Sequence, residues 1–363
     1  MTTLMRYLLR EHLRVLALCL AGLVSIYLIV DFVEKIRKFM IYQAELRHIL
    51  RYFALKLPGI LFQVTPLAVL MSTLLTLAIL SRNHEITAMR SNGISLYWVA
   101  IPFLAVAQVV SLLMLWASDV VIPAANQQAE ILRETRIEGR SPQAVFRGNK
   151  IWVRLGDQTL MKGDLPDDSS PRLYGISLFR LGPDFSIREL LYAKELLHED
   201  GRWVLITGTS LAFTTDRVVK SRTFDRLPIT LNQKPEDFRR AIRVNSDALS
   251  LRDLAAYVER LRQDGYNPAR YAADLFGRTA FPFVCLIMAL IGVSLSLMET
   301  GVRGAGIVKG VGYSLLIGFL YWSTHSVALA LGRSDVVPPL LAGWSANICF
   351  LAFAGYLFLR VRQ

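Results

Sequence analysis

Six long apolar stretches constrain this chain more strongly than any other feature of its sequence. They lie at Val15–Val33, Leu57–Leu80, Ile94–Ser118, Thr279–Met298, Gly310–Gly332 and Val336–Leu359. A helix needs about 20 consecutive apolar residues to cross the hydrocarbon core of a bilayer, and its backbone must be hydrogen-bonded internally there. Since 53% of the 363 residues are hydrophobic, we predict an α-helical membrane protein with six transmembrane helices.

The positions of Lys and Arg near the ends of these stretches predict how the helices are oriented. An even number of spans puts both termini on one side of the membrane. The basic residues on that side are Arg6, Arg10, Arg14, Arg82, Arg90, Arg303, Lys309, Arg360 and Arg362, and the acidic ones are Glu11, Glu85 and Glu299. Because Lys and Arg are enriched in cytoplasmic segments, we expect both termini in the cytoplasm and the long segment 119–278 on the opposite side.

The segment 119–278 carries its own strand pattern. The sequences NKIWVRLG, LYGISLFRLG and GRWVLITGTSLAF alternate or are rich in β-branched and aromatic residues, and Asp200-Gly201 is a strong hairpin signal. We predict an extracytoplasmic β domain at about 140–232, followed by an amphipathic helix that begins at a capping box of Ser250 and Asp253. The predicted division is 1–122 for spans one to three, 123–270 for the β domain with flanking helical segments, and 271–363 for spans four to six.

Sequence signatures of enzymes, nucleotide sites and metal sites are absent. The chain has no GxxxxGK[ST] loop, no HExxH and no GxSxG motif. Its five histidines show no metal-ligand spacing, and its cysteines, Cys19, Cys285 and Cys349, all fall within apolar stretches. We therefore expect no catalytic residue, no metal and no cofactor. His325, inside the fifth stretch, is either a functional intramembrane group or a neutral residue hydrogen-bonded within the bundle.

The charged segment RNHEITAMRSNG separates the second and third apolar stretches. We predict a helix at about 82–92, with Asn83 as its N-cap and Gly93 as its stop. Ile86 and Met89 share one face. The polar flanks carry Arg82, Glu85 and Arg90. Because so short a helix is unstable alone in water, it must dock, either at the membrane interface or on a partner that hydrolyses ATP for a chain with no nucleotide site.

Charged residues also gather after the first apolar stretch. The basic ones are Lys35, Arg37, Lys38, Arg47, Arg51 and Lys56, and the acidic ones are Asp31, Glu34 and Glu45. On the expected topology this segment faces away from the cytoplasm, where the positive-inside bias disfavours it. Two explanations stay open: the bases extend to lipid headgroups, or they bind a substrate with several negative charges and an acyl body, since Arg and Lys both bind phosphate.

Five segments form a recognisable set: RYLLREHL, DFVEKIRKF, LPGILFQVTPLAVLMSTLLTL, SRNHEITAMRSNGIS and RTAFPFVCLIMALIGVSLSL. Together they resemble the lipopolysaccharide-export permeases of the LptF/LptG (YjgP/YjgQ) family, in the family's order and over essentially the whole chain. The segment DALSLRDLAAYVERLRQDGYNPARY is more similar to the LptG branch. The resemblance implies a place in the bacterial inner membrane and a periplasmic, jelly-roll-like β domain.

The resemblance also implies partners and site residues. It implies a heterodimer with an LptF-like permease, an LptB-like ATPase dimer that binds the short helix, an LptC-like bridge protein, surrounding membrane lipids and no nucleic acid. The ATPase-coupling residues would be Arg82, Glu85, Ile86, Met89 and Arg90, with Glu85 as the family's acidic coupling residue. Arg37 and Lys38 would contact lipopolysaccharide phosphates. A third basic site of some LptG chains is occupied here by Asp31, for which Lys35 is the candidate substitute.

We therefore hypothesise that the chain is the permease subunit of an ATP-driven exporter. It would extract lipopolysaccharide from the inner membrane and pass it to a periplasmic bridge towards the outer membrane. Closure of the ATPase would move the helix around Glu85 as a lever, and the converging spans would push the lipid into the β domain. Two alternatives remain at this point: a permease of another ATP-driven lipid or lipoprotein transporter, and a membrane-anchored envelope scaffold.

Overall fold

The chain divides into two compact units. One unit, Met1–Leu132 with Ser246–Gln363, is helical, and the other, Arg133–Asn245, is a β unit. The computed structural model describes residues 2–137, 144–147, 150–155, 158–164, 173–182, 186–199, 202–214, 217–229, 246–263, 267–298 and 306–360.

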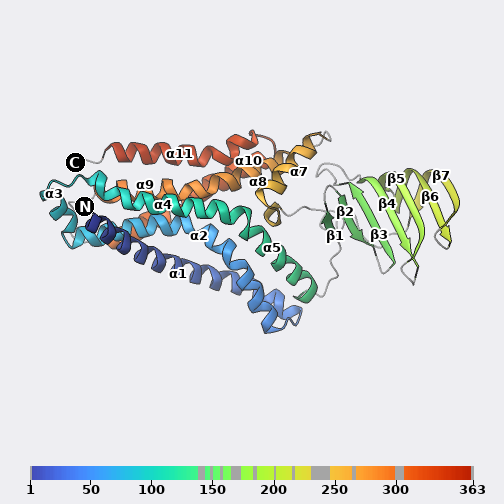
Figure 1. The fold of residues 1–363 in the computed structure, drawn as a ribbon, viewed down its shortest axis with the longest axis horizontal. Helices are drawn as coiled ribbons and strands as arrows, with labels where there is room; N and C mark the ends of the chain where they lie inside the picture. The colour runs from blue at the N-terminus through green and yellow to red at the C-terminus, as the bar shows by residue number, and fades with distance from the viewer. Residues whose placement is uncertain are drawn as a thin grey trace. The chain divides into compact units, whose positions relative to one another are not determined.

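Among the described residues, six helices are long and apolar enough to cross a membrane. They are α1 (Thr2–Ile41), α2 (Leu46–Arg82), α4 (Leu96–Asp119), α8 (Ala269–Ala280) continuing into α9 (Val284–Met298), α10 (Gly306–Arg333) and α11 (Pro339–Leu359) (Figure 1). Each coincides with one predicted stretch, so the prediction of a multi-span helical membrane protein is confirmed. The shorter helices of this unit are α3 (Glu85–Ser91), α5 (Val121–Leu132), the turn η2 (Ser246–Ala248) and α7 (Leu251–Gln263).

The charged segment between the first two spans is helical on both sides of a short turn. Helix α1 continues to Ile41, α2 begins at Leu46, and only residues 42–45 connect them. Lys, Arg, Leu and Glu are good helix formers, and the chain turns at Gln43, which has a left-handed φ of 49°. Across the turn, the rings of Phe39 and Tyr52 meet edge to face at 5.5 Å. The charged helix ends are therefore packed together as a hairpin.

Helix α8 passes into α9 through one turn of 3₁₀ helix, η3 (Phe281–Phe283). In an α-helix the N–H of Val284 would bond the Ala280 carbonyl, but in this turn it bonds the Phe281 carbonyl instead. The Ala280 carbonyl accepts a 2.7 Å hydrogen bond from Asn347 on α11, and the Pro282 carbonyl accepts one of 2.8 Å from Ser111 on α4. Asn347 in turn accepts a 2.7 Å bond from the hydroxyl of Tyr321 on α10. Polar side chains thus join α4, α10 and α11 to the break, as lipid surroundings require.

The described strands of the β unit form one antiparallel seven-stranded sheet in chain order (Figure 1). After the π-helical turn η1 (Arg133–Ile137), they are β1 (Ala144–Arg147), β2 (Lys150–Arg154), β3 (Thr159–Asp164), β4 (Leu173–Leu181), β5 (Ile187–Glu199), β6 (Arg202–Thr214) and β7 (Arg217–Ile229). The inserted all-β domain is confirmed, and Glu199 pairs with Arg202 as the hairpin signal predicted. These strands pair as a meander, without the crossing connections of a standard jelly roll among them.

One face of this sheet carries an apolar core. Met161, Leu178 and Leu191 are direct partners on β3, β4 and β5, and each is at most 1% exposed. Further along β6, Thr207 has a left-handed φ of 48°, and the pairing with β5 is interrupted beside it. The pairing of β6 with β7 shifts register between Ala212 and Phe213, and irregularities of that kind bend a strand.

Helix α7 begins as predicted. The backbone N–H of Asp253 donates a 3.0 Å hydrogen bond to Ser250 Oγ, which donates one of 2.6 Å to the Asp253 carboxylate. Its buried stripe consists of Leu254, Tyr257, Val258 and Leu261. The rings of Tyr257 and Tyr271 lie 4.9 Å apart, so α7 packs on α8 within the helical unit.

Close approach of α8 and α11 predicts a large effect for one glycine. A Cβ atom at Gly343 would lie 2.7 Å from the backbone carbonyl carbon of Phe276, whereas a Cβ at Gly355, on the same helix, would have nothing within 4 Å. We expect Gly343→Ala to lower the free energy of unfolding by about 1–3 kcal/mol, because overpacking moves backbone. Thermal unfolding of the detergent-solubilised protein measures the effect. Equal unfolding temperatures for Gly343→Ala and the control Gly355→Ala would contradict it.

Candidate functional site

The short helix α3 differs from the sequence prediction at its N-terminal end and agrees with it at its C-terminal end. Helix α2 runs on to Arg82, and the N–H of Asn83 bonds back to the Ile79 carbonyl at 3.0 Å. Asn83 is therefore the C-cap of α2, and the prediction that it caps α3 is wrong. His84, with a left-handed φ of 61°, precedes α3. Gly93, with φ 77°, follows its C-cap as predicted.

The apolar face of α3 is fixed to the helical unit. Ile86 and Met89 are only 1% and 8% exposed. They belong to a buried cluster whose other members come from α1, α2, α4 and α9: Leu8, Leu77, Leu80, Leu96, Val99, Ala100, Phe103, Val293 and Leu297. Two residues predicted to contact a partner therefore contact the chain's own core.

The polar side of α3 remains at the surface. Arg82, Thr87 and Arg90 are exposed, and Glu85 is partly exposed. The Glu85 carboxylate accepts a 3.2 Å hydrogen bond from the hydroxyl of Tyr7 on α1. This arrangement presents the Glu85 carboxylate and the Arg90 guanidinium on α3, with the Arg82 guanidinium beside them at the end of α2.

We expect Ile86→Ala to loosen α3. Truncating a buried Ile costs about 2–5 kcal/mol, and a helix of this length has little stability of its own. Amide hydrogen exchange of residues 85–91 should accelerate, while that of the β strands stays unchanged. Thr87→Ala, at an exposed position one residue away, is the control. Equal protection of α3 in the two variants would show that the buried face does not hold it.

The predicted basic residues of α1 separate into two environments. Lys35 turns towards the protein, where its ammonium binds Asp31 at 2.7 Å and lies 5.5 Å from the centre of the Tyr52 ring. Arg37 is exposed. The side chain of Lys38 lies outside the described residues. The structure therefore places Lys35 with Asp31, one helical turn earlier, and leaves Arg37 at the surface.

Lys35 lines a cavity of about 330 Å³ within the helical unit, between α1, α2, α5, α8 and α10. Its charged lining residues are Asp31, Lys35, Lys56, Asp247, Asp274, Arg278 and Arg333, and its apolar ones include Ile60, Phe62, Ile122, Phe281, Trp322 and Leu329. His325, 7% exposed, also lines it, stacked on the ring of Tyr321 at 5.7 Å. The cavity thus combines ionic groups with an apolar wall.

Large apolar surfaces flank this cavity. On α1, Ile26, Ile29, Val30 and Val33 are each more than 60% exposed, as are Phe319, Trp322 and Val327 on α10. In a membrane protein such faces meet lipid or another helix. An amphiphile with an anionic head and apolar chains matches a charged cavity beside such faces. Among the described residues, no cluster of His, Cys, Asp and Glu has the composition and geometry of a metal site.

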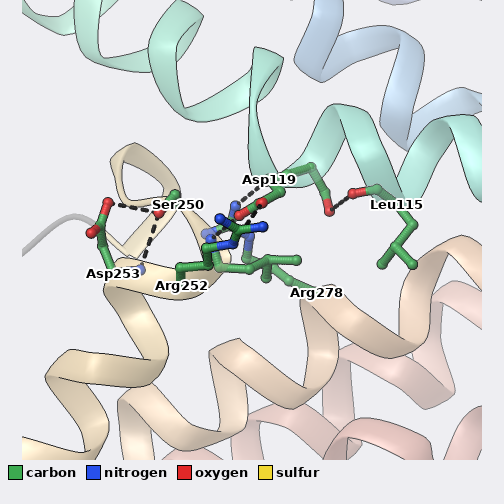
Figure 2. A network of polar contacts seen from close by, with 8 residues as sticks. Leu115, Asp119, Ser250, Arg252, Asp253 and Arg278 are labelled. Carbon is green, nitrogen blue, oxygen red and sulfur yellow. Dashed lines mark hydrogen bonds and ion pairs between the residues drawn. The ribbon is translucent and has the colours of Figure 1, made fainter.

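A polar cluster around Arg278 was missed at the level of sequence. Its guanidinium, on α8, donates to three backbone carbonyls: Ser118 at 2.6 Å, Leu249 at 2.8 Å and Ser246 at 2.9 Å. Figure 2 shows Arg278 reaching the end of α4 near Asp119, with Ser250 and Asp253 at the start of α7. The sequence did offer one signal for this cluster. Arg278 directly precedes the apolar stretch of span four, and a charged group at a membrane span usually has a functional role or polar partners.

Comparisons with known proteins agree with this architecture. The family model of the lipopolysaccharide export system permease LptF/LptG matches residues 6–360. The lipopolysaccharide export system permease protein LptG of Haemophilus influenzae (strain ATCC 51907 / DSM 11121 / KW20 / Rd) is 22% identical, over 99% of each chain. That of Escherichia coli (strain K12) is also 22% identical, over 98% of this chain and 97% of its own.

Proposed function

This chain belongs to the lipopolysaccharide export system permease LptF/LptG family, and from that premise we propose that it is the permease subunit of an ATP-driven lipopolysaccharide exporter. It would extract lipopolysaccharide from the inner membrane and pass it to a periplasmic bridge. Membership of a permease family makes the chain a transport subunit and not an enzyme. ATP hydrolysis would come from a partner, an LptB-like ATPase dimer.

The observation that carries this proposal is the cavity that Lys35 lines. Its ionic groups suit a phosphorylated headgroup, since Arg and Lys both bind phosphate. The exposed apolar faces of α1 and α10 suit acyl chains. Exposing those chains to water costs about 0.8 kcal/mol per CH₂ group, so a carrier has to keep them covered throughout the transfer.

The proposed membrane topology places α3 in the cytoplasm and the β unit in the periplasm. The excess of Lys and Arg on the side of the termini supports this orientation. On the cytoplasmic side, Arg82, Glu85 and Arg90 would contact the ATPase, and Ile86 and Met89 would transmit its movement. An LptF-like permease would complete the heterodimer, and an LptC-like protein would receive the lipid beyond the β unit.

A pull-down from native membranes tests the proposal as a whole. The protein should co-purify with a second permease chain, an ATPase and bound lipopolysaccharide, all identified by mass spectrometry. Recovery of a lipoprotein or another lipid in place of lipopolysaccharide would assign the chain to a different transporter. Recovery without an ATPase, together with normal delivery of lipopolysaccharide to the cell surface after depletion, would indicate an envelope scaffold.

Glu85→Ala should lower transport by at least about tenfold, because truncating one partner of an interfacial charge pair costs about 2–5 kcal/mol. The ATPase should also bind more weakly. Tyr7→Phe is the matched control, since it removes the internal hydrogen bond to Glu85 and keeps the carboxylate. Lipopolysaccharide release and ATPase retention on the purified complex measure both effects. Normal assembly and release in Glu85→Ala would refute the lever.

Charge reversal at the end of α1 should weaken substrate capture. In Arg37→Glu with Lys38→Glu, photo-crosslinking to lipopolysaccharide is expected to fall about tenfold, because each lost charge-assisted hydrogen bond contributes about 1.5–3 kcal/mol. Basal ATP hydrolysis should remain at the wild-type rate. For the single change Arg37→Glu, the control is Arg47→Glu, another exposed base in the same helical hairpin. Equal effects at the two positions would mean that only general surface charge matters.

A further inference from the structure

One side chain, Arg278, binds the backbone at the end of α4, just before the helix that leads out to the β unit, and at the start of the segment that returns from it. We propose that Arg278 is a positioning residue for lipid transport. It ties the root of the β unit, by which we mean α5 together with residues 246–251, to α8. Movement of the transport helices would then reach that root. The inference rests on the proposed function and adds to it a residue and a mechanical role.

The outgoing segment is held at the end of α4. Arg278 Nη2 donates a 2.6 Å hydrogen bond to the carbonyl of Ser118. Helix α5 begins at Val121, and the helical unit ends with it at Leu132. The segment that leads out to the β unit therefore starts three residues after a carbonyl that Arg278 binds.

The returning segment is held by the other guanidinium nitrogen. Arg278 Nη1 donates to the carbonyls of Ser246 at 2.9 Å and Leu249 at 2.8 Å. Ser246 is the first residue of the returning part of the helical unit. The backbone N–H of Leu251 also donates to the Asp119 carboxylate at 3.0 Å, which links the two segments directly. One cation therefore fixes the first and the last turn of the root.

A second contact joins this root to α10. Asp274, one turn before Arg278 on α8, binds Arg333 at the end of α10 and the hydroxyl of Ser246, each at 2.7 Å. Asp274, Arg278 and Arg333 also line the cavity that contains Lys35. A shift of α8 or α10 around a bound headgroup would therefore act directly on the root.

The chemistry of arginine suits this role. Its planar guanidinium carries five N–H donors in a fixed fork, so it can bind carbonyls from two segments at once. A lysine ammonium is a point charge with a different reach, and a glutamine side chain has only two donors. Arg278→Lys should therefore retain part of the joint, and Arg278→Gln should lose most of it.

The first test measures coupling. Each variant is made in the full chain, assembled with its native partner proteins and reconstituted into proteoliposomes. In Arg278→Gln, lipopolysaccharide transported per ATP hydrolysed should fall about tenfold, within the usual range for coupled sites. The ATPase rate is measured in the same proteoliposomes, so that transport is expressed per ATP hydrolysed in every variant. Arg278→Lys should fall between Arg278→Gln and the wild type. Arg252→Gln is the control, because this neighbouring side chain is 91% exposed and its ion pair with Asp119 is long, at 3.9 Å.

The second test measures position. Spin labels at Gln128 on α5 and at Val336 beyond α10, both exposed, are introduced with Cys349→Ser to remove the exposed native thiol. In the wild-type complex the distance between the labels should be narrowly distributed and should change on nucleotide binding. In Arg278→Gln the distribution should broaden and lose that change.

The outcomes separate this inference from the proposed function. Normal transport per ATP in Arg278→Gln, or a loss of transport with an unaltered label distribution, would overturn the role of Arg278. Should Arg278→Gln fail to fold, wild-type coupling and label distances in Arg278→Lys would overturn it equally. A wild-type complex that moves no lipopolysaccharide would instead contradict the proposed function, and the label distances would still decide whether Arg278 fixes the root.

Discussion

The need to satisfy backbone carbonyls away from water is the constraint on which the helical unit depends. Lipid offers no hydrogen-bond donors, so each carbonyl that leaves regular helix geometry must be bound by the protein. At the break between α8 and α9, Asn347 and Ser111 perform this task. In the last turn of α8, Arg278 binds carbonyls that α4 and the returning chain present. Hydrogen bonds to backbone carbonyls therefore add to the side-chain packing that holds α8 in place.

Sequence alone predicted the features that depend on residues close together in the chain. A membrane span needs a certain apolar length, so all six spans were found from the sequence. The alternating segment LYGISLFRLG became β4, and Asp200-Gly201 separates β5 from β6 as its turn chemistry indicated. The capping pair of Ser250 and Asp253 is equally local, and it formed as predicted.

The features that were missed depend on residues far apart in the chain. Asn83 has the side chain of an N-cap, but packing of α2 extends that helix past the expected start of α3. The sequence of the charged segment after span one does not show that Phe39 and Tyr52 pack together across its turn. The structural role of Arg278 depends on its hydrogen bonds to the carbonyls of Ser118 and Ser246, which lie 160 and 32 residues away in the sequence. No periodicity within one segment reports such contacts.

Burial of Ile86 and Met89 changes how the short helix can transmit force. A helix that rested loosely at an interface would absorb a push by moving. Close-packed interiors have low compressibility and transmit strain, so under the proposed function an anchored α3 would pass its displacement to the ends of α1, α2, α4 and α9, whose residues share its buried cluster. The same contacts that make so short a helix stable would therefore also make it an efficient lever.

The mixture of charges in the cavity bears on how the proposed transport site would hold and release a lipid. Lys35 is paired with Asp31, and Arg333 with Asp274, so these two bases are partly neutralised before any anion arrives. A cavity lined with bases alone would hold a phosphorylated lipid tightly and release it slowly. A transport site must bind its substrate well enough to admit it and weakly enough to let it leave. Under the proposed function, the paired carboxylates would weaken the hold of these bases on a phosphate, because an entering phosphate has to share each base with a carboxylate or displace that carboxylate.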